Sequence, residues 1–321
     1  MSDSAIVSVV IPVYNAEAFI DEALESIFAQ DYPSFEVIVV NDGSTDATAQ
    51  RIATHGDKVR FFEQPNSGGF PGSPRNLGLQ HSRGEFICFL DADDIMLPGR
   101  LRLQADLLRE HFDVGVVFGD YQNFTENGHV GSSHFATCPL LTTHLRGRPT
   151  VVLGPSDATS LLLRENVGGA GTMMIRRQAL EEAPEFSLSF RIGEDFHFYY
   201  RILRRFSLGI ANQVTTLRRI HDSNVTGDPL SMLHNVIASR SALCESEHSE
   251  ENLAALREVV HSCEITLARA YANQGDFGRS ITYNLRAMTG GLPRRPHWIA
   301  AGLRGLVRTA AIAMNLKRPS S

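Results

Sequence analysis

Three carboxylates follow directly after a short apolar run at residues 86–94. The run Phe-Ile-Cys-Phe-Leu ends in Asp91, Asp93 and Asp94. Carboxylates packed this closely repel one another, and a shared hard divalent cation relieves that repulsion because such ions prefer oxygen ligands. The alternative is a solvated acidic turn that caps the next helix, which is the commoner explanation of an isolated Asp-Ala-Asp. The other polar segments of the chain decide between the two.

The apolar run itself predicts a strand buried on both faces, as in parallel sheets. Its acids then lie at the carboxyl end of the strand, where open α/β sheets bind ligands. Two earlier predicted strands, residues 7–11 and 35–40, also end in polar segments, at residues 12–15 and at Asp42. Helices predicted between the strands imply parallel β-α-β units with crossovers of one hand. We therefore expect the three polar segments to meet at one edge of the sheet.

The second half continues this α/β pattern and then becomes helical. A helix after Pro98 precedes a buried strand at residues 114–118, and the aperiodic segment 122–168 is interpreted as loops over the site. Glu194 and Asp195 begin a helix, where the alternative role of acids is to offset the helix dipole. A strand at 214–220 ends at His221. Helices at 229–244, 250–274, 277–288 and 296–315 follow, so the predicted domains are 1–228 and a helical extension, 229–321.

Composition excludes several classes of protein. The 321 residues are 43% hydrophobic, which is ample for a packed core, and the net charge of −6 gives no reason to expect a nucleic-acid partner. The four cysteines show no motif spacing, so neither a disulfide framework nor a zinc site is indicated. No basic and apolar leader opens the sequence, and no apolar stretch reaches the length of a membrane span. These features predict a cytoplasmic protein.

Six ordered motifs make the chain similar to the family 2 glycosyltransferases, which have the GT-A fold. The motifs are SVVIPVYN at 8–15, VVNDGSTD at 39–46, NSG at 66–68, RNLG at 75–78, FLDADD at 89–94 and GED at 193–195. The resemblance covers about residues 7–226 and leaves the helical extension uncovered. It implies an α/β protein with a Rossmann-like mixed sheet flanked by helices.

The resemblance also implies roles for individual residues. The backbone around Pro12 and Tyr14 and the Asp42 carboxylate would hold the nucleotide base and ribose, with Arg75 near the diphosphate and Asp91 facing the ribose. Asp93 would bind Mg²⁺ or Mn²⁺, and in some members a histidine placed like His221 completes the metal or diphosphate site. Asp195 resembles the catalytic base, and Glu194 is its helper or structural neighbour at the acceptor. For His221 the alternative is a simple hydrogen bond at a strand end.

The chemistry of sugar transfer requires such groups. A divalent ion neutralises the leaving diphosphate as a Lewis acid, and one positioned carboxylate takes the proton of the attacking hydroxyl. A single displacement then inverts the anomeric centre. The resemblance thus predicts a metal-dependent, inverting hexosyltransferase that moves one sugar from a nucleotide-diphosphate donor, a UDP-sugar by preference. The acceptor would be a glycan or a lipid-linked sugar in polysaccharide biosynthesis.

The sequence departs from the family pattern in two places. Pro74 stands where the family usually has Ala, which affects the expected placement of Arg75. The Gln-x-x-Arg-Trp signature of processive synthases is absent, so transfer of one sugar per encounter is favoured. One alternative is a sugar nucleotidyltransferase, disfavoured because the first strand is not followed by a glycine-rich basic loop. The other is a non-catalytic scaffold that binds nucleotide sugars.

The carboxy-terminal tail has a strongly basic composition. Residues 277–321 contain no Asp or Glu but eight Lys and Arg. Trp298, Leu303 and Val307 interleave with Arg304 and Arg308, as in an amphipathic helix that lies on an anionic membrane surface. The alternative is a terminal helix packed on the protein with solvated arginines. The first hypothesis places the protein peripherally at the cytoplasmic face of the inner membrane.

Overall fold

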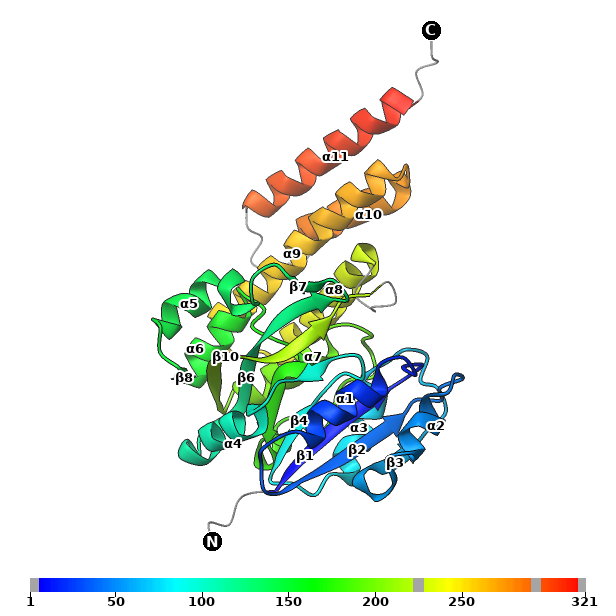
Figure 1. Cartoon of the computed structure of the whole chain (residues 1–321). Coiled ribbons are helices and arrows are strands. Elements are labelled where there is room, and N and C mark those ends of the chain that lie inside the picture. Colours follow the sequence, from blue (N-terminus) through cyan, green and yellow to red (C-terminus); the bar gives the residue numbers. More distant parts are fainter. Residues whose placement is uncertain (1–5, 222–227, 290–295, 317–321) are drawn as a thin grey trace. The chain divides into compact units, whose positions relative to one another are not determined.

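The computed structural model describes residues 6–221, 228–289 and 296–316. It divides the chain into two compact units, Met1–Asn224 and Val225–Ser321 (Figure 1). The first unit contains the strands and the second contains the last four helices. Four basic residues of the carboxy-terminal tail, Arg294, Arg295, Lys317 and Arg318, lie outside the described residues.

The first unit is organised by a mixed sheet, which confirms the predicted α/β class. The order along the sheet is β3-β2-β1-β4-β9-β6-β10-β5, with β7 paired to β6 and β8 paired to β10. The strands of the described chain are β1 (Val7–Val13), β2 (Phe35–Asn41), β3 (Arg60–Glu63), β4 (Phe86–Phe89), β5 (Ile95–Met96), β6 (Val114–Thr125), β7 (Gly128–Val130), β8 (Thr150–Leu153), β9 (Met173–Arg176) and β10 (Ser207–Arg219).

Parallel pairing brings the polar segments to one edge, as predicted. Strand β1 is parallel to β2 with Val13 opposite Asn41, and parallel to β4 with Val10 opposite Phe89. Backbone hydrogen bonds extend both pairings by one residue, because Asp42 N donates to Val13 O and Leu90 N donates to Val10 O, at 2.8 and 3.1 Å. Asp42 and Asp91 therefore leave the sheet at the same end of the two strands that flank β1.

Helices cover both faces of this sheet. Helices α1 (Ile20–Phe28), α2 (Thr48–Ala53) and α4 (Arg100–Glu110) pack on one face and contribute to one apolar core with β1 and β2. In α1 the buried positions are 20, 23, 24 and 27, the spacing of a single helical stripe. Helix α3 (Gly72–His81) lies against the opposite face, where Gly78 approaches the Val10 side chain so closely that a Cβ would meet it at 2.3 Å. The sheet is thus held rigid from both sides.

The segment 122–168 differs from the prediction of loops. It continues β6 to Thr125 and contains β7, the helices α5 (Pro139–Leu145) and α6 (Pro155–Leu162), and β8. Strand β8 runs antiparallel to β10, a partner more than fifty residues later in the chain. The prediction was wrong because each element is at most eight residues long, too short for a clear period, and β8 is completed by distant pairing.

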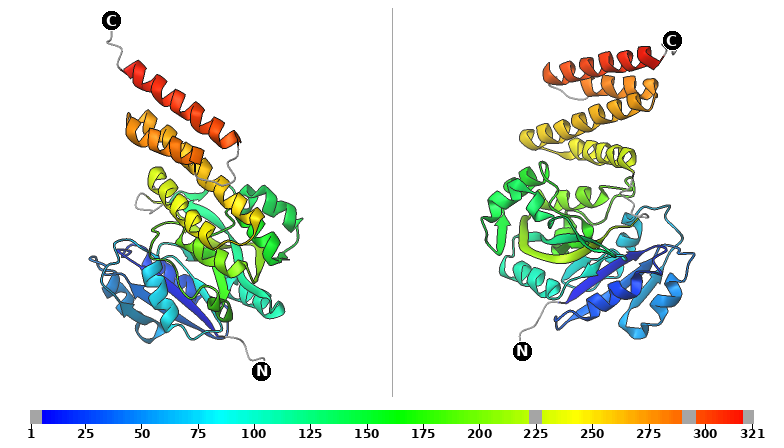
Figure 2. Two further views of the ribbon diagram at one scale, coloured as in Figure 1. Left: turned by 180° about the vertical axis from the view of Figure 1, so that it is seen from behind. Right: turned by 45° about the horizontal axis from the view of Figure 1, so that its top comes forward.

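The second unit consists of the helices α8 (Pro229–Ser246), α9 (Glu250–Asn273), α10 (Phe277–Thr289) and α11 (Pro296–Leu316). Their predicted boundaries are confirmed to within about two residues, the usual accuracy of helix ends. Figure 2 shows them in yellow to red, following one another side by side. Local capping explains two of the starts, since Asp228 accepts from Leu230 N and Ser231 N, and Ser249 accepts from Asn252 N.

Helix α11 packs on its own unit. The Trp298 side chain is buried, stacks on His261 and donates to a Glu258 carboxylate at 2.9 Å, while Leu303 and Val307 are exposed. Membrane contact through α11 stays a prediction. None of the helices described combines the length and apolar character needed to cross a bilayer.

Candidate active site

Arg75 joins two of the predicted acids, one of which lies 119 positions later in the sequence. Its guanidinium, 6% exposed, donates to Glu194 Oε1 at 2.6 Å and to Asp91 Oδ1 at 2.8 Å. Burial lowers the pKa of Arg75, but the carboxylates of Asp91, Glu194 and Asp195 outweigh it, so the net pKa is raised and the side chain stays charged. The end of β4 and the start of α7 (Glu194–Leu203) are therefore fixed against one cation.

Asp195 projects from the first turn of α7 beside a glycine-rich turn. Gly193, with φ of 82°, precedes the helix in the left-handed conformation that glycine adopts readily. Asp195 Oδ2 accepts from Ala170 N at 3.3 Å, and Oδ1 accepts from Phe196 N at 2.7 Å. A Cβ at Gly169 would lie 2.9 Å from Asp195 Oδ2. Asp195 is thus oriented by backbone donors and remains partly exposed, as a group that contacts substrate must be.

Asp93 and His221 form a second pair at the end of β4. His221 Nε2 lies 2.9 Å from Asp93 Oδ2, and the imidazole stacks on Phe19 with ring centroids 5.0 Å apart. Arg219 Nε donates to Asp93 O, which fixes the turn that contains Asp93. The structure therefore brings together the two residues predicted to bind a metal ion, although they are 128 positions apart.

Burial and mutual repulsion perturb the acids of this turn. The pKa of Asp93 is raised by burial and by Asp91, against the hydrogen bond from His221. The pKa of Asp94 is raised well above its ordinary value, first by burial and then by Asp91 and Asp93. Asp94 Oδ1 also accepts from Arg219 N at 2.9 Å. Clustered acids with raised pKa values are characteristic of sites that bind cations or move protons.

Asp42 is held more tightly than the sequence implies. The side chain is 4% exposed, and its Oδ1 accepts from Gln64 Nε2 at 2.7 Å and from Ser67 N at 3.0 Å. Ser67 Oγ donates to Oδ2 at 2.6 Å. Tyr14 is half exposed, and Pro12 is partly buried. Asp42 therefore organises the loop around Ser67 in addition to its predicted role toward a nucleotide.

Gln64 links the Asp42 loop to helix α3. Its Nε2 also donates to Ser73 Oγ at 2.9 Å, and Ser73 belongs to the same helix as Arg75. Arg75 in turn donates to Glu194 Oε1 at 2.6 Å, which joins that helix to α7. A continuous chain of contacts thus runs from Asp42 to the acids of α7.

Two structural residues of the site escaped the sequence analysis. Arg100 is fully buried and donates to the carbonyls of Gly171 and Phe89, so it ties the turn beside Asp91 to the end of β4. Asn76 exchanges two hydrogen bonds with the backbone of Phe186, at 2.9 and 2.7 Å. The position of Asn76 inside the RNLG motif could have indicated its role. The sequence around Arg100 contains no comparable motif.

The stability of the protein should depend on pH through Glu194. Burial, and then repulsion by Asp195, raises the pKa of Glu194 to about 8, despite the attraction of Arg75. The unfolded chain loses this proton near pH 4.3. Between these two values the folded state binds more protons, so the free energy of unfolding falls as pH rises. Glu194→Gln should remove this contribution, which amounts to about 1.4 kcal/mol per pH unit between the two pKa values because one proton is involved.

Urea denaturation at pH 5, 6, 7 and 8.5 measures this slope directly. Glu110→Gln, an exposed carboxylate on α4, is the matched control and should leave the slope unchanged. Equal slopes for the wild type and Glu194→Gln would show that Glu194 is ionised throughout.

Comparisons with known proteins identify the family. Residues 8–183 match the family described as glycosyl transferase family 2. An uncharacterized glycosyltransferase of Rickettsia typhi is 29% identical over 250 residues, which are 77% of this chain and 74% of that protein.

Two enzymes with solved structures extend the likeness. The poly(ribitol-phosphate) β-N-acetylglucosaminyltransferase TarS of Staphylococcus aureus is 36% identical over 165 residues, which are 50% of this chain and 28% of TarS. The crystal structure of TarS 1–349 in complex with UDP has a TM-score of 0.65 at 19% identity and covers 98% of this chain and 92% of that one. The mannosyltransferase PcManGT of Pyrobaculum calidifontis, in complex with GDP-Man and Mn²⁺, has a TM-score of 0.57 at 18% identity, with coverages of 99% and 89%.

The family match covers more than half of the chain, and the structural likeness extends over nearly all of it. The GT-A fold predicted from the six motifs is confirmed. The chain belongs to glycosyl transferase family 2 and is a glycosyltransferase.

Proposed function

We propose that the protein transfers one sugar from a UDP-sugar to a hydroxyl group with inversion, and that it requires a divalent metal ion. The observation that carries the proposal is the bridge through Arg75. Its guanidinium bonds both Asp91, just after β4, and Glu194, at the start of α7 and next to Asp195. UDP in the crystal structure of TarS, a protein of the same fold, supports the choice of nucleotide.

In this proposal Asp195 is the general base. Its carboxylate is oriented by Ala170 N and is partly exposed, so it can accept the proton of a bound acceptor hydroxyl as that oxygen attacks the anomeric carbon. Arg75 is a positioning residue. Because Arg75 pairs with the Asp91 carboxylate, it keeps the net negative charge around Asp195 low while the diphosphate leaves.

The residues at the end of β4 fit a divalent ion. Asp93 and His221 offer a carboxylate oxygen and an imidazole nitrogen 2.9 Å apart, with the Asp91 carboxylate close enough to raise the pKa of Asp93. Within the described ranges no three His, Cys, Asp or Glu side chains close around a common ion. Mg²⁺ and similar ions are commonly bound by one or two protein ligands, with substrate phosphates and water completing the shell. When bound, the ion neutralises the leaving diphosphate.

The acceptor we propose is a phosphate-bearing glycan or lipid-linked sugar. The name of TarS specifies a poly(ribitol-phosphate) substrate, and TarS is similar to half of this chain. The substrate named for TarS supports the prediction from the sequence that the acceptor is a glycan.

Metal binding tests the proposal most directly. Hydrolysis of UDP-sugars should require Mn²⁺ and stop with EDTA. Asp93→Asn should weaken Mn²⁺ binding in the presence of UDP by about tenfold or more, measured by electron paramagnetic resonance, because loss of a ligand costs at least as much as loss of its outer-shell partner. Asp31→Asn, at a side chain that is 93% exposed, is the matched control and should bind Mn²⁺ normally. Unchanged Mn²⁺ binding in Asp93→Asn would refute the metal assignment.

A further inference from the structure

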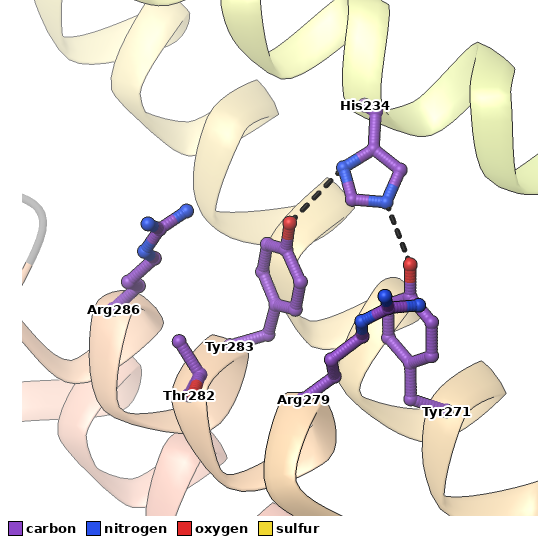
Figure 3. A pocket seen from close by; sticks show the side chains of 6 residues that line it. All are labelled: His234, Tyr271, Arg279, Thr282, Tyr283 and Arg286. Atoms are coloured by element: carbon purple, nitrogen blue, oxygen red, sulfur yellow. Dashed lines mark hydrogen bonds between the residues drawn. The ribbon is translucent and has the colours of Figure 1, made fainter. Parts of the chain in front are cut away.

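The second unit contains a pocket of about 450 Å³ formed by α8, α9 and α10. A volume of this size is within the range of sites for small ligands and exceeds what a single inorganic anion fills. Figure 3 shows the side chains that line it, two arginines, two tyrosines, a histidine and a threonine: His234, Tyr271, Arg279, Thr282, Tyr283 and Arg286. None of these residues belongs to the site described above.

A histidine and two tyrosines form a fixed polar wall in this pocket. His234 Nε2 lies 2.8 Å from the Tyr271 hydroxyl and Nδ1 lies 3.0 Å from the Tyr283 hydroxyl (Figure 3). The two phenol rings stack with centroids 5.8 Å apart. A neutral imidazole donates through one nitrogen and accepts through the other, so one tyrosine accepts from His234 and keeps its own proton. At least one phenol O–H is therefore available to donate to a ligand.

Two arginines place positive charge beside these hydroxyls. Arg279 and Arg286 are two turns apart on the same side of α10, with Thr282 and Tyr283 between them. Arg279 lies over the Tyr271 ring and is 3.5 Å from the Asp276 carboxylate, while Arg286 lies over the Tyr283 ring. Among the described residues no carboxylate lies within ion-pair distance of Arg286. This guanidinium is the stronger candidate to bind an anion.

The buried acid that interacts with Arg286 is only partly ionised at neutral pH. Glu264, on α9, is 6% exposed, and burial raises its pKa to about 7 although Arg286 lowers it. From Phe277 to the end of the sequence there is no Asp or Glu. The pocket is therefore basic. Its wall also contains a phenol O–H donor and two tyrosine rings.

We propose that this pocket binds a phosphate group carried on a sugar or polyol. A guanidinium pairs with two phosphate oxygens at once, and a third oxygen remains to accept from the phenol O–H, whereas a carboxylate must use the same two oxygens for both partners. The remaining volume accommodates the sugar or polyol against the tyrosine rings. The assignment of this ligand as part of the acceptor rests on the function proposed above, whereas the binding of phosphate does not.

Calorimetric titration of the full chain with inorganic phosphate and with glycerol 3-phosphate tests the proposal at low salt. Arg286→Gln should weaken binding by about tenfold or more, because a charge-assisted hydrogen bond is lost. Tyr283→Phe keeps the ring and removes the hydroxyl, and should weaken binding several-fold. Arg304→Gln, at an exposed arginine on α11 outside the pocket, is the matched control and should bind as the wild type does. Circular dichroism verifies that each variant is folded.

Four outcomes would overturn the proposal. Three are no phosphate binding by the wild type, equal weakening by Arg286→Gln and Arg304→Gln, and binding of an acidic peptide but not of phosphate. The fourth is binding only to phosphatidylglycerol vesicles, which would assign the pocket to a lipid surface. UDP binding and Mn²⁺-dependent donor hydrolysis should be unchanged in Arg286→Gln. If the wild type binds phosphate but does not hydrolyse the donor, the proposed function is rejected and the phosphate-binding proposal is retained.

Discussion

Asp195→Asn should lower the rate of sugar transfer by about 10²–10⁴-fold, the usual contribution of a general base. The amide oxygen of Asn can still accept from Ala170 N or Phe196 N, so the local structure should persist while the capacity to take a proton is lost. The affinity for UDP should stay within about twofold of the wild type, because the loss concerns the transition state and not donor binding. Steady-state kinetics and UDP titration measure the two quantities separately.

Asp157→Asn is the matched control for this experiment. Asp157 is an exposed carboxylate in the first turn of α6, as Asp195 is in the first turn of α7. It should retain full turnover. If Asp195→Asn also retains turnover, the base is another residue. If the wild type binds UDP but transfers no sugar to any acceptor, the scaffold alternative is the better account of the chain.

Arg75→Met should reduce the free energy of unfolding by about 3–5 kcal/mol at pH 8.5, because it leaves the buried Glu194 carboxylate without its cation. The loss should be smaller at pH 6, where Glu194, with a pKa raised to about 8, can remain protonated and needs no partner. Urea denaturation of the wild type and the variant at both pH values gives the difference.

Arg51→Met provides the contrast for Arg75→Met. Arg51 pairs with Asp21 at 2.7 Å, but its side chain is 50% exposed, and exposed pairs contribute about 0–1 kcal/mol. A cost as small for Arg75→Met as for Arg51→Met at pH 8.5 would show that the bridge between Asp91 and Glu194 does not stabilise the fold. Donor hydrolysis by the folded Arg75→Met variant then reports the contribution of Arg75 to positioning.

Local patterns in the sequence were sufficient to predict the strands and helices that carry the motifs. The apolar run before Asp91 predicted β4, and the helices predicted between the first strands are present as α1 and α2, because the burial period of a strand or helix is visible in neighbouring residues. The one-handed crossover rule then placed Asp42 and Asp91 at one edge of the sheet, which β1, β2 and β4 confirm. The boundaries of α8 to α11 followed for the same local reason.

Tertiary structure decided the contacts between segments that are distant in sequence. The antiparallel insertion of β9 between β4 and β6, and the pairing of β8 with β10, depend on long-range hydrogen bonds that no local period encodes. Arg75 pairs with Glu194, and the fully buried Arg100 donates to the carbonyl of Gly171, about seventy residues away. His234 likewise meets Tyr271 and Tyr283 only once three helices have packed. The motifs specified the chemical groups, and only the packing of sheet and helices set the distances between them, because a side-chain contact depends on where two backbones pass in space.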